Sequence, residues 1–207
     1  MKIYEFGNLN SDIILVQPVD EHDLSAIENE IVFIKQEVDK DFGLIAVKVD
    51  DWNNDLSPWP MKAVFGNHDF GSGASKTLNE ILKLCDDKTK TYYIGGYSLA
   101  ALFSLWAVYQ TNIFSGVASA SPSMWFEGFI EYMKSNLIKT SKVYLSLGDK
   151  EDKTRNQIMA TVKERIEISY SFLKEKGVNT TLEWNKGNHF QDFDLRVAKA
   201  FIWLMNN

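Results

Sequence analysis

Short apolar runs alternate along this chain with longer segments in which apolar residues recur every three or four positions. The short runs have the length of buried β-strands, and they are bounded by polar or turn-forming residues. Six such runs predict strands at 13–16, 44–49, 92–94, 117–120, 143–147 and 181–184.

The segments between the predicted strands have the periodicity of amphipathic helices. They predict helices at 24–38, 78–85, 99–109, 158–173 and 193–205. The segment 99–109 is apolar nearly all round, which predicts a buried helix. Gly177 is expected to end the fourth helix, and Asp192 is expected to cap the fifth.

This alternation of strands and helices predicts an α/β fold with a mainly parallel central sheet and helices on both faces. The length of 207 residues suits one domain over 1–207. Ligand sites in such sheets lie at the carboxyl ends of the strands. The segment 50–75 is long for a loop and carries Trp52, Trp59 and Phe65, so we expect it to cover such a site.

A serine occupies the junction between the third predicted strand and the buried helix. The residues 91–100 read TYYIGGYSLA, which places Ser98 directly after a strand and directly before a helix. A sharp turn there exposes a serine hydroxyl and needs small residues two positions before and two after it. Gly96 and Ala100 occupy these positions, although glycine is usual at both. Ser98 is therefore the candidate nucleophile, and the alternative is a serine that only caps a helix.

A serine hydroxyl needs a neighbouring base, and the base needs a partner that orients it. His189 follows the last predicted strand and is the candidate base. The loop after 143–147 supplies the acid, and we prefer Glu151 over Asp149 and Asp152, which chain order does not exclude.

An oxyanion that develops on the substrate needs backbone N–H donors. Leu99, directly after the serine, is the first candidate donor. The second is expected from 17–20, after the first predicted strand. Pro18 has no N–H, so Val19 is the candidate.

Composition narrows the classes of partner. The net charge is −6 without a basic run, so no nucleic-acid partner is expected. No stretch of 18 apolar residues predicts a membrane span, and no signal peptide is recognisable, so a cytoplasmic protein is expected. Cys85 is the only cysteine and the three histidines lack ligand spacing, so no metal is expected. No Gly-x-Gly-x-x-Gly follows a strand, and no cofactor is expected.

Four motifs together resemble the α/β-hydrolase superfamily, and within it the esterase family that includes esterase D-like enzymes. They are GGYSLA at 95–100, SPSMW at 121–125, GDKE at 148–151 and GNH at 187–189. The resemblance implies an α/β-hydrolase fold without a separate cap domain and the hydrolysis of carboxylic esters. Some members of the family act on siderophore or feruloyl esters, and in some a serine and histidine suffice without the acid.

We therefore predict a serine esterase that acts through an acyl-enzyme on a small or aromatic ester. Five aromatic residues near the motifs are candidates for the substrate pocket: Tyr97, Trp52, Trp59, Trp125 and Phe190. Two alternatives remain. One is a thioesterase or acyltransferase that uses the same nucleophile, and the other is a non-catalytic binding protein on a hydrolase scaffold.

Overall fold

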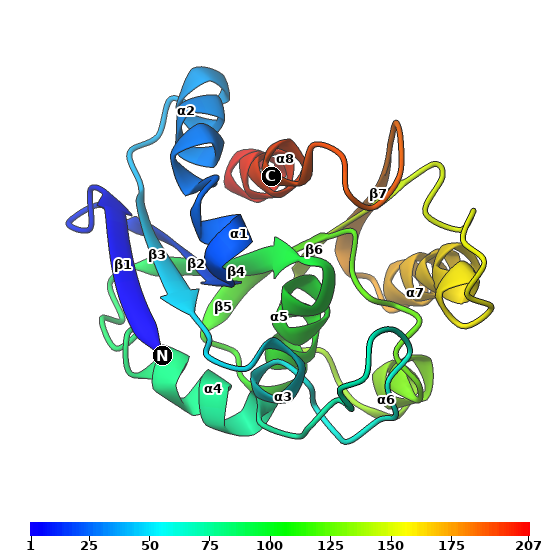
Figure 1. Cartoon of the computed structure of the whole chain (residues 1–207). Helices are drawn as coiled ribbons and strands as arrows, with labels where there is room; N and C mark the ends of the chain where they lie inside the picture. Colours follow the sequence, from blue (N-terminus) through cyan, green and yellow to red (C-terminus); the bar gives the residue numbers. More distant parts are fainter.

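The computed structural model describes residues 1–207, and a seven-stranded sheet runs through its centre (Figure 1). The strand order is β1-β3-β2-β4-β5-β6-β7. Only the pairing of β1 with β3 is antiparallel, and all the other pairs are parallel. The mainly parallel sheet is therefore confirmed. The strands are β1 (Lys2–Gly7), β2 (Ile13–Val19), β3 (Gly43–Lys48), β4 (Thr91–Tyr97), β5 (Phe114–Ala120), β6 (Lys142–Gly148) and β7 (Asn179–Asn185).

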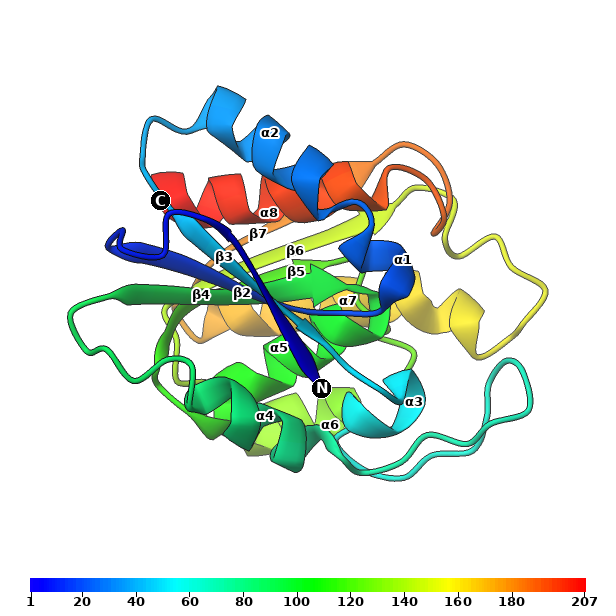
Figure 2. The same ribbon diagram turned by 60° about the vertical axis from the view of Figure 1, so that its left-hand side comes forward.

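Helices cover both faces of the sheet, as Figure 2 shows. One face packs against α2 (Ile27–Glu37) and α8 (Phe193–Asn206). The other packs against α4 (Ala74–Leu82), α5 (Ser98–Gln110), α6 (Phe129–Ser135) and α7 (Val162–Glu175). Successive side chains of a strand point to opposite faces. In β2, Leu15 accordingly packs on the side of α2 and α8, whereas Ile14 and Val16 pack on the side of α5.

Three predicted helices differ from those observed. The segment 24–38 lies in two helices, α1 (Glu21–Leu24) and α2. Asp20 caps the start of α1 by accepting a hydrogen bond from the Asp23 N–H, and α1 ends at Leu24, where the Ser25 hydroxyl donates to the His22 carbonyl. The helix predicted at 78–85 ends at Leu82. The helix predicted from 158 begins with a short 3₁₀ turn, η1 (Met159–Thr161), before α7.

Some elements were not predicted. The strand β1 alternates polar and apolar residues, but it lies at the edge of the sheet and is mostly exposed. The helix α6 is only seven residues long. The segment 50–75 is a long loop that contains regular structure: α3 (Trp52–Asp55) and an antiparallel bridge between Met61 and Phe70.

The parallel strands bring several turns to one edge of the sheet. Ser98 follows β4, Ser121 follows β5, Glu151 lies shortly after β6, and His189 follows β7. In Figure 2 the connections after β3, β6 and β7 project at the same side of the molecule. None of the helices combines the length and apolar character required to span a membrane.

Candidate active site

Ser98 lies at the junction between β4 and α5. It is the first residue of α5, and its φ of +57° is in the left-handed region, which a residue other than glycine rarely adopts. The chain reverses there from a buried strand into a buried helix, and the Ser98 carbonyl accepts a hydrogen bond from the Ser123 N–H at 3.1 Å. Strain of this kind is concentrated at functional sites.

The close packing of β4 against α5 explains how alanine is accommodated at position 100. A Cβ atom on Gly96 would lie 2.8 Å from the Ala100 Cβ, which is too close for two carbon atoms. Glycine at 96 therefore provides the space that the Ala100 methyl group occupies. One glycine is sufficient for this turn.

A continuous hydrogen-bonded chain joins Ser98, His189 and Glu151. The Ser98 Oγ lies 3.0 Å from the His189 Nε2, and the His189 Nδ1 lies 2.6 Å from the Glu151 Oε2. An ionised carboxylate only accepts hydrogen bonds, so Nδ1 carries the hydrogen in this pair. The Nε2 atom is then free to accept the hydrogen of the Ser98 hydroxyl.

The surroundings of Glu151 keep it ionised. Burial raises the pKa of Glu151. The hydrogen bond and charge of His189, the Gly148 N–H and the Ser121 hydroxyl together lower it by more, so the pKa is below its ordinary value. The Gly148 N–H and the Ser121 hydroxyl donate to Oε1 at 2.7 and 2.8 Å. Arg196 also donates to Oε1, at 2.8 Å.

The other two carboxylates of the loop have different partners. Asp149 accepts a hydrogen bond from the Gly187 N–H at 2.8 Å and so ties the loop after β6 to the loop after β7. Asp152 pairs with the exposed Lys153 at 2.9 Å. Only Glu151 contacts the His189 ring.

Sequence reasoning missed three polar residues behind and beside this chain. Ser121 has a φ of +45° and bonds Glu151, and the Ser123 Oγ lies 3.3 Å from the Ser98 Oγ. Both belong to the SPS motif, so the motif itself was the available signal. Arg196 had a weaker signal, a charged residue on the face of α8 that packs against the sheet.

A cavity of about 470 Å³ opens beside Ser98 and His189. Of the five predicted pocket aromatics it includes Trp125 and Phe190, and Phe65 joins them from the segment 50–75. The lining contains no lysine or arginine. The lining residues are Phe65, Ser98, Pro122, Trp125, Glu151, Thr154, Met159, Val162, His189 and Phe190.

The remaining three predicted aromatics do not line this cavity. Tyr97 is buried, and its hydroxyl donates to the His189 carbonyl at 2.8 Å. Trp59 packs against Phe126 and the rings of α6, and its Nε1 donates to the Glu127 carbonyl at 3.0 Å. Trp52 begins α3 and packs against the core on the α5 side of the sheet.

The predicted oxyanion donors differ in their surroundings. Leu99 is the second residue of α5, and the first N–H groups of a helix have no partner within that helix. Val19 is the last residue of β2; its carbonyl accepts from the Val49 N–H, and its side chain is buried on the side of α2 and α8.

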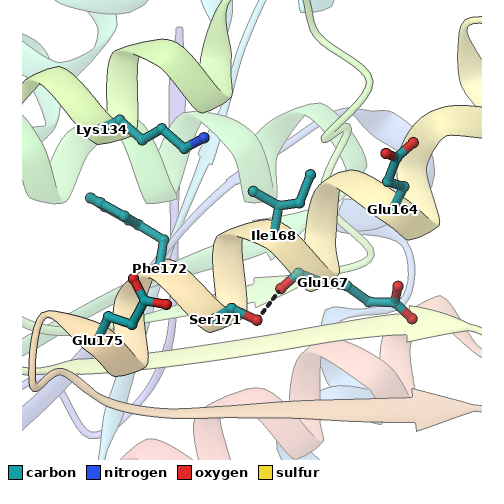
Figure 3. A pocket seen from close by; sticks show the side chains of 7 residues that line it. All are labelled: Lys134, Glu164, Glu167, Ile168, Ser171, Phe172 and Glu175. Carbon is teal, nitrogen blue, oxygen red and sulfur yellow. Dashed lines mark hydrogen bonds between the residues drawn. The ribbon is translucent and has the colours of Figure 1, made fainter.

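A second hollow lies between α6 and α7, away from this site. Figure 3 shows Lys134 from α6 facing side chains along α7, among them Glu164, Phe172 and Glu175. The only hydrogen bond drawn there joins the Ser171 hydroxyl to the Glu167 carbonyl. No histidine contacts this serine, so the hollow lacks an activated nucleophile. Nowhere in the structure do three His, Cys, Asp or Glu side chains converge as metal ligands.

Sequence comparisons find one distant curated relative. No family model matches the chain. The uncharacterised protein YbbA of Bacillus subtilis (strain 168) is 23% identical over 180 residues, which cover 78% of this chain and 72% of YbbA. An identity this low assigns no activity.

Solved structures match over nearly the whole chain. The enterobactin esterase FES from Shigella flexneri superposes with a TM-score of 0.67 and 13% identity; the match covers 99% of this chain but only 55% of that esterase. Esterase PE8 gives a TM-score of 0.64 and 15% identity, covering 99% of this chain and all of PE8. An α/β serine hydrolase homologue from Coxiella burnetii gives 0.57 and 14% identity, covering 99% and 90%. The chain has the α/β-hydrolase fold of these esterases and serine hydrolases.

Proposed function

We propose that this protein is a serine-dependent carboxylic ester hydrolase. The observation that carries the proposal is the distance of 3.0 Å between the Ser98 Oγ and the His189 Nε2, with Glu151 on the other ring nitrogen. Nucleophile, base and orienting acid are thus within hydrogen-bond reach of one another, which is the arrangement that activates a serine. The fold shared with a carboxylesterase and with esterase PE8 supports the same activity.

The reaction begins when the Ser98 Oγ attacks the ester carbonyl and its proton passes to the His189 Nε2. The negative charge that develops on the carbonyl oxygen is stabilised by the N–H groups of Leu99 and Val19. The ester C–O bond then breaks, and His189 returns the proton to the departing alcohol. A water molecule next gives a proton to the His189 Nε2 and attacks the acyl-enzyme. The bond from the acyl carbon to the Ser98 Oγ then breaks, His189 returns the proton to that oxygen, and the acid is released. Glu151 holds the ring and stabilises its cationic form throughout.

We propose an uncharged acyl group of small or aromatic type, and the lining of the cavity supports this. Five of its ten lining residues are hydrophobic, Phe65, Trp125 and Phe190 among them, and its volume of about 470 Å³ is within the range of small-molecule sites. Structural neighbours include a carboxylesterase from Bacillus cereus and a ferulic acid esterase. We propose ester substrates of the same general kind for this chain.

The test combines turnover with active-site labelling. Ser98→Ala is expected to reduce the hydrolysis of a short p-nitrophenyl ester by at least about 10³-fold and to abolish labelling by a fluorophosphonate. Ser123→Ala is the matched control, because its hydroxyl is adjacent but contacts no base. This control should retain the label. A folded wild-type protein that neither turns over esters nor takes the label would favour a non-catalytic binding role.

A further inference from the structure

A buried arginine lies directly behind the proposed catalytic acid. Arg196 extends from α8 and is 1% exposed. Its Nη1 donates to the Glu151 Oε1 at 2.8 Å, to the Tyr97 hydroxyl at 3.0 Å and to the Ser121 Oγ at 3.1 Å. Its Nη2 donates to the backbone carbonyls of Lys186 and Asn188 at 3.2 and 3.0 Å. One side chain therefore contacts the end of β4 and the turns after β5, β6 and β7.

These contacts adjoin every proposed catalytic residue. Tyr97 directly precedes Ser98, and Asn188 directly precedes His189. The two oxygens of Glu151 have different partners. Oε2 contacts the His189 Nδ1, while Oε1 accepts hydrogen bonds from Arg196, Ser121 and the Gly148 N–H. The planar guanidinium presents several donors in a fixed geometry, so it restrains the carboxylate and the His189 loop together.

The arginine also changes the charge of the buried group. Arginine stays protonated in proteins. With His189 neutral, the charges of Glu151 and Arg196 cancel, and protonation of His189 brings the group to +1. Without Arg196 the group would begin at −1 and become neutral. A buried net charge is costly, so Arg196 opposes protonation of the resting His189.

Other titratable groups around His189 do not replace this charge. Burial and the charge of Glu151 raise the pKa of Tyr97, so its hydroxyl stays neutral in the range where esterases are assayed. Asp149 is hydrogen-bonded to the Gly187 backbone. The charges that directly contact the ring and its acid are those of Glu151 and Arg196.

We propose that Arg196 is a positioning residue that orients Glu151 and the His189 loop. Its charge also keeps His189 unprotonated, and so able to act as a base, at a lower pH than would be possible without Arg196. This inference rests on the proposed esterase function. It assigns a role to a residue outside the serine, histidine and acid of the reaction itself.

The test compares two substitutions that separate charge from geometry. Arg196→Gln removes the charge but retains hydrogen-bond donors, and it is expected to move the acidic limb of the kcat/KM profile upward by about one pH unit. Arg196→Lys retains the charge but loses the planar arrangement of guanidinium N–H donors. It should lower kcat while its acidic limb stays within about 0.3 pH units of wild type. Ser121→Ala, which loosens the same network without a charge change, should also leave the limb in place.

Three results would overturn the proposal: an unmoved limb in the Gln variant, a limb that moves in the Lys variant, or equal movement in Ser121→Ala. If the Gln variant does not fold, Arg196→Met replaces it. If neither neutral variant folds, the position of the acidic limb in Arg196→Lys decides. The pH midpoint of the His189 ring resonances, followed by NMR, should rise by the same amount in the neutral variant. That measurement needs no turnover, so it separates failure of this inference from failure of the proposed esterase activity.

Discussion

Three carboxylates within four residues follow β6, and they differ in what surrounds them. Glu151 is buried, holds the His189 Nδ1 at 2.6 Å, and receives three donors on its other oxygen. Asp149 accepts a hydrogen bond from the Gly187 N–H in the loop after β7, and Asp152 pairs with the exposed Lys153. The geometry of the histidine therefore depends on one of the three.

This difference predicts separate outcomes for the three amide substitutions. Glu151→Gln should lower kcat/KM for a p-nitrophenyl ester by about 10²–10⁴-fold, because an amide neither holds the Nδ1 hydrogen as strongly nor stabilises the cationic ring. Asp152→Asn should change it by less than about threefold, and Asp149→Asn by an intermediate factor through the loop it anchors. Steady-state kinetics on proteins with native circular dichroism spectra provide the measurement. A Glu151→Gln enzyme of near wild-type activity would indicate that Ser98 and His189 act without an acid.

At the level of elements, β2 and α2 share a buried polar pair on the opposite face of the sheet from α5. Gln17 from β2 donates to the Glu30 Oε1 at 3.2 Å, and both residues are almost completely buried. The Glu30 Oε2 and the Gln17 Oε1 have no partner among the other residues. A proton on Oε2 would allow Glu30 to donate to the amide oxygen. Burial raises the pKa of Glu30 well above its ordinary value despite the Gln17 hydrogen bond, and the charges of Asp23 on α1 and Asp194 on α8 add to this rise.

The raised pKa predicts that the protein loses stability as pH increases. The folded state keeps the Glu30 proton, whereas the unfolded chain releases it above about pH 4.5. The free energy of unfolding should therefore be highest below that pH, as far as this group is concerned, and should fall as pH rises toward the folded pKa. Asp23 contributes in the same direction, because burial raises its pKa to about 7.

Glu30→Gln removes one of these two titrations and keeps a donor and an acceptor in place. Between pH 5 and 8 we expect its urea midpoint to decline less than that of the wild type, with the larger difference at pH 8. Glu28→Gln, on the exposed side of α2, is the matched control and should follow the wild type. Parallel curves for wild type and Glu30→Gln would show that Glu30 does not titrate in this range.

The elements also show what could be read from sequence. Most strands and the helices on both faces followed from hydrophobic periodicity, because burial on both sides makes central parallel strands continuously apolar. The break between α1 and α2 did not, since it falls at Ser25 and Ala26 within a continuous apolar face. Ser98, His189 and Glu151 were found because each directly follows or lies shortly after a strand. Arg196 was missed because its partners come from the end of one strand and the turns after three others, and such convergence appears only after folding.

On the scale of the whole molecule, the long connections after β3 and β6 line the cavity together with residues at the carboxyl ends of the strands. Phe65 comes from the first and Thr154 from the second, and the Asn156 Nδ2 donates to the Val64 carbonyl at 2.6 Å, which joins the two connections. The chain carries a net charge of −6, and no cationic side chain lines the cavity. We therefore expect the site to disfavour an anionic substrate, because neither the net charge nor the lining attracts one.

This charge distribution predicts selectivity between esters of matched shape. We expect an ester whose acyl group ends in a carboxylate to have a kcat/KM at least about tenfold lower than its neutral isostere. Raising the ionic strength from 0.01 to 0.2 M shortens the Debye length from about 30 Å to under 10 Å. The rate for the anionic ester should then increase, whereas the neutral ester should change by less than about twofold.

Thr154→Lys offers a direct check of the same physical cause. Thr154 lines the cavity and is partly exposed, so a lysine there can place its ammonium group at the mouth without being buried. The substitution should raise the anionic-to-neutral ratio of kcat/KM by about fivefold or more at low salt, and the gain should shrink at 0.2 M. Thr154→Gln, of similar reach but no charge, should leave the ratio unchanged. If both esters react equally fast with the wild type, shape rather than charge selects the substrate, and the aromatic residues Phe65, Trp125 and Phe190 become the positions that determine specificity.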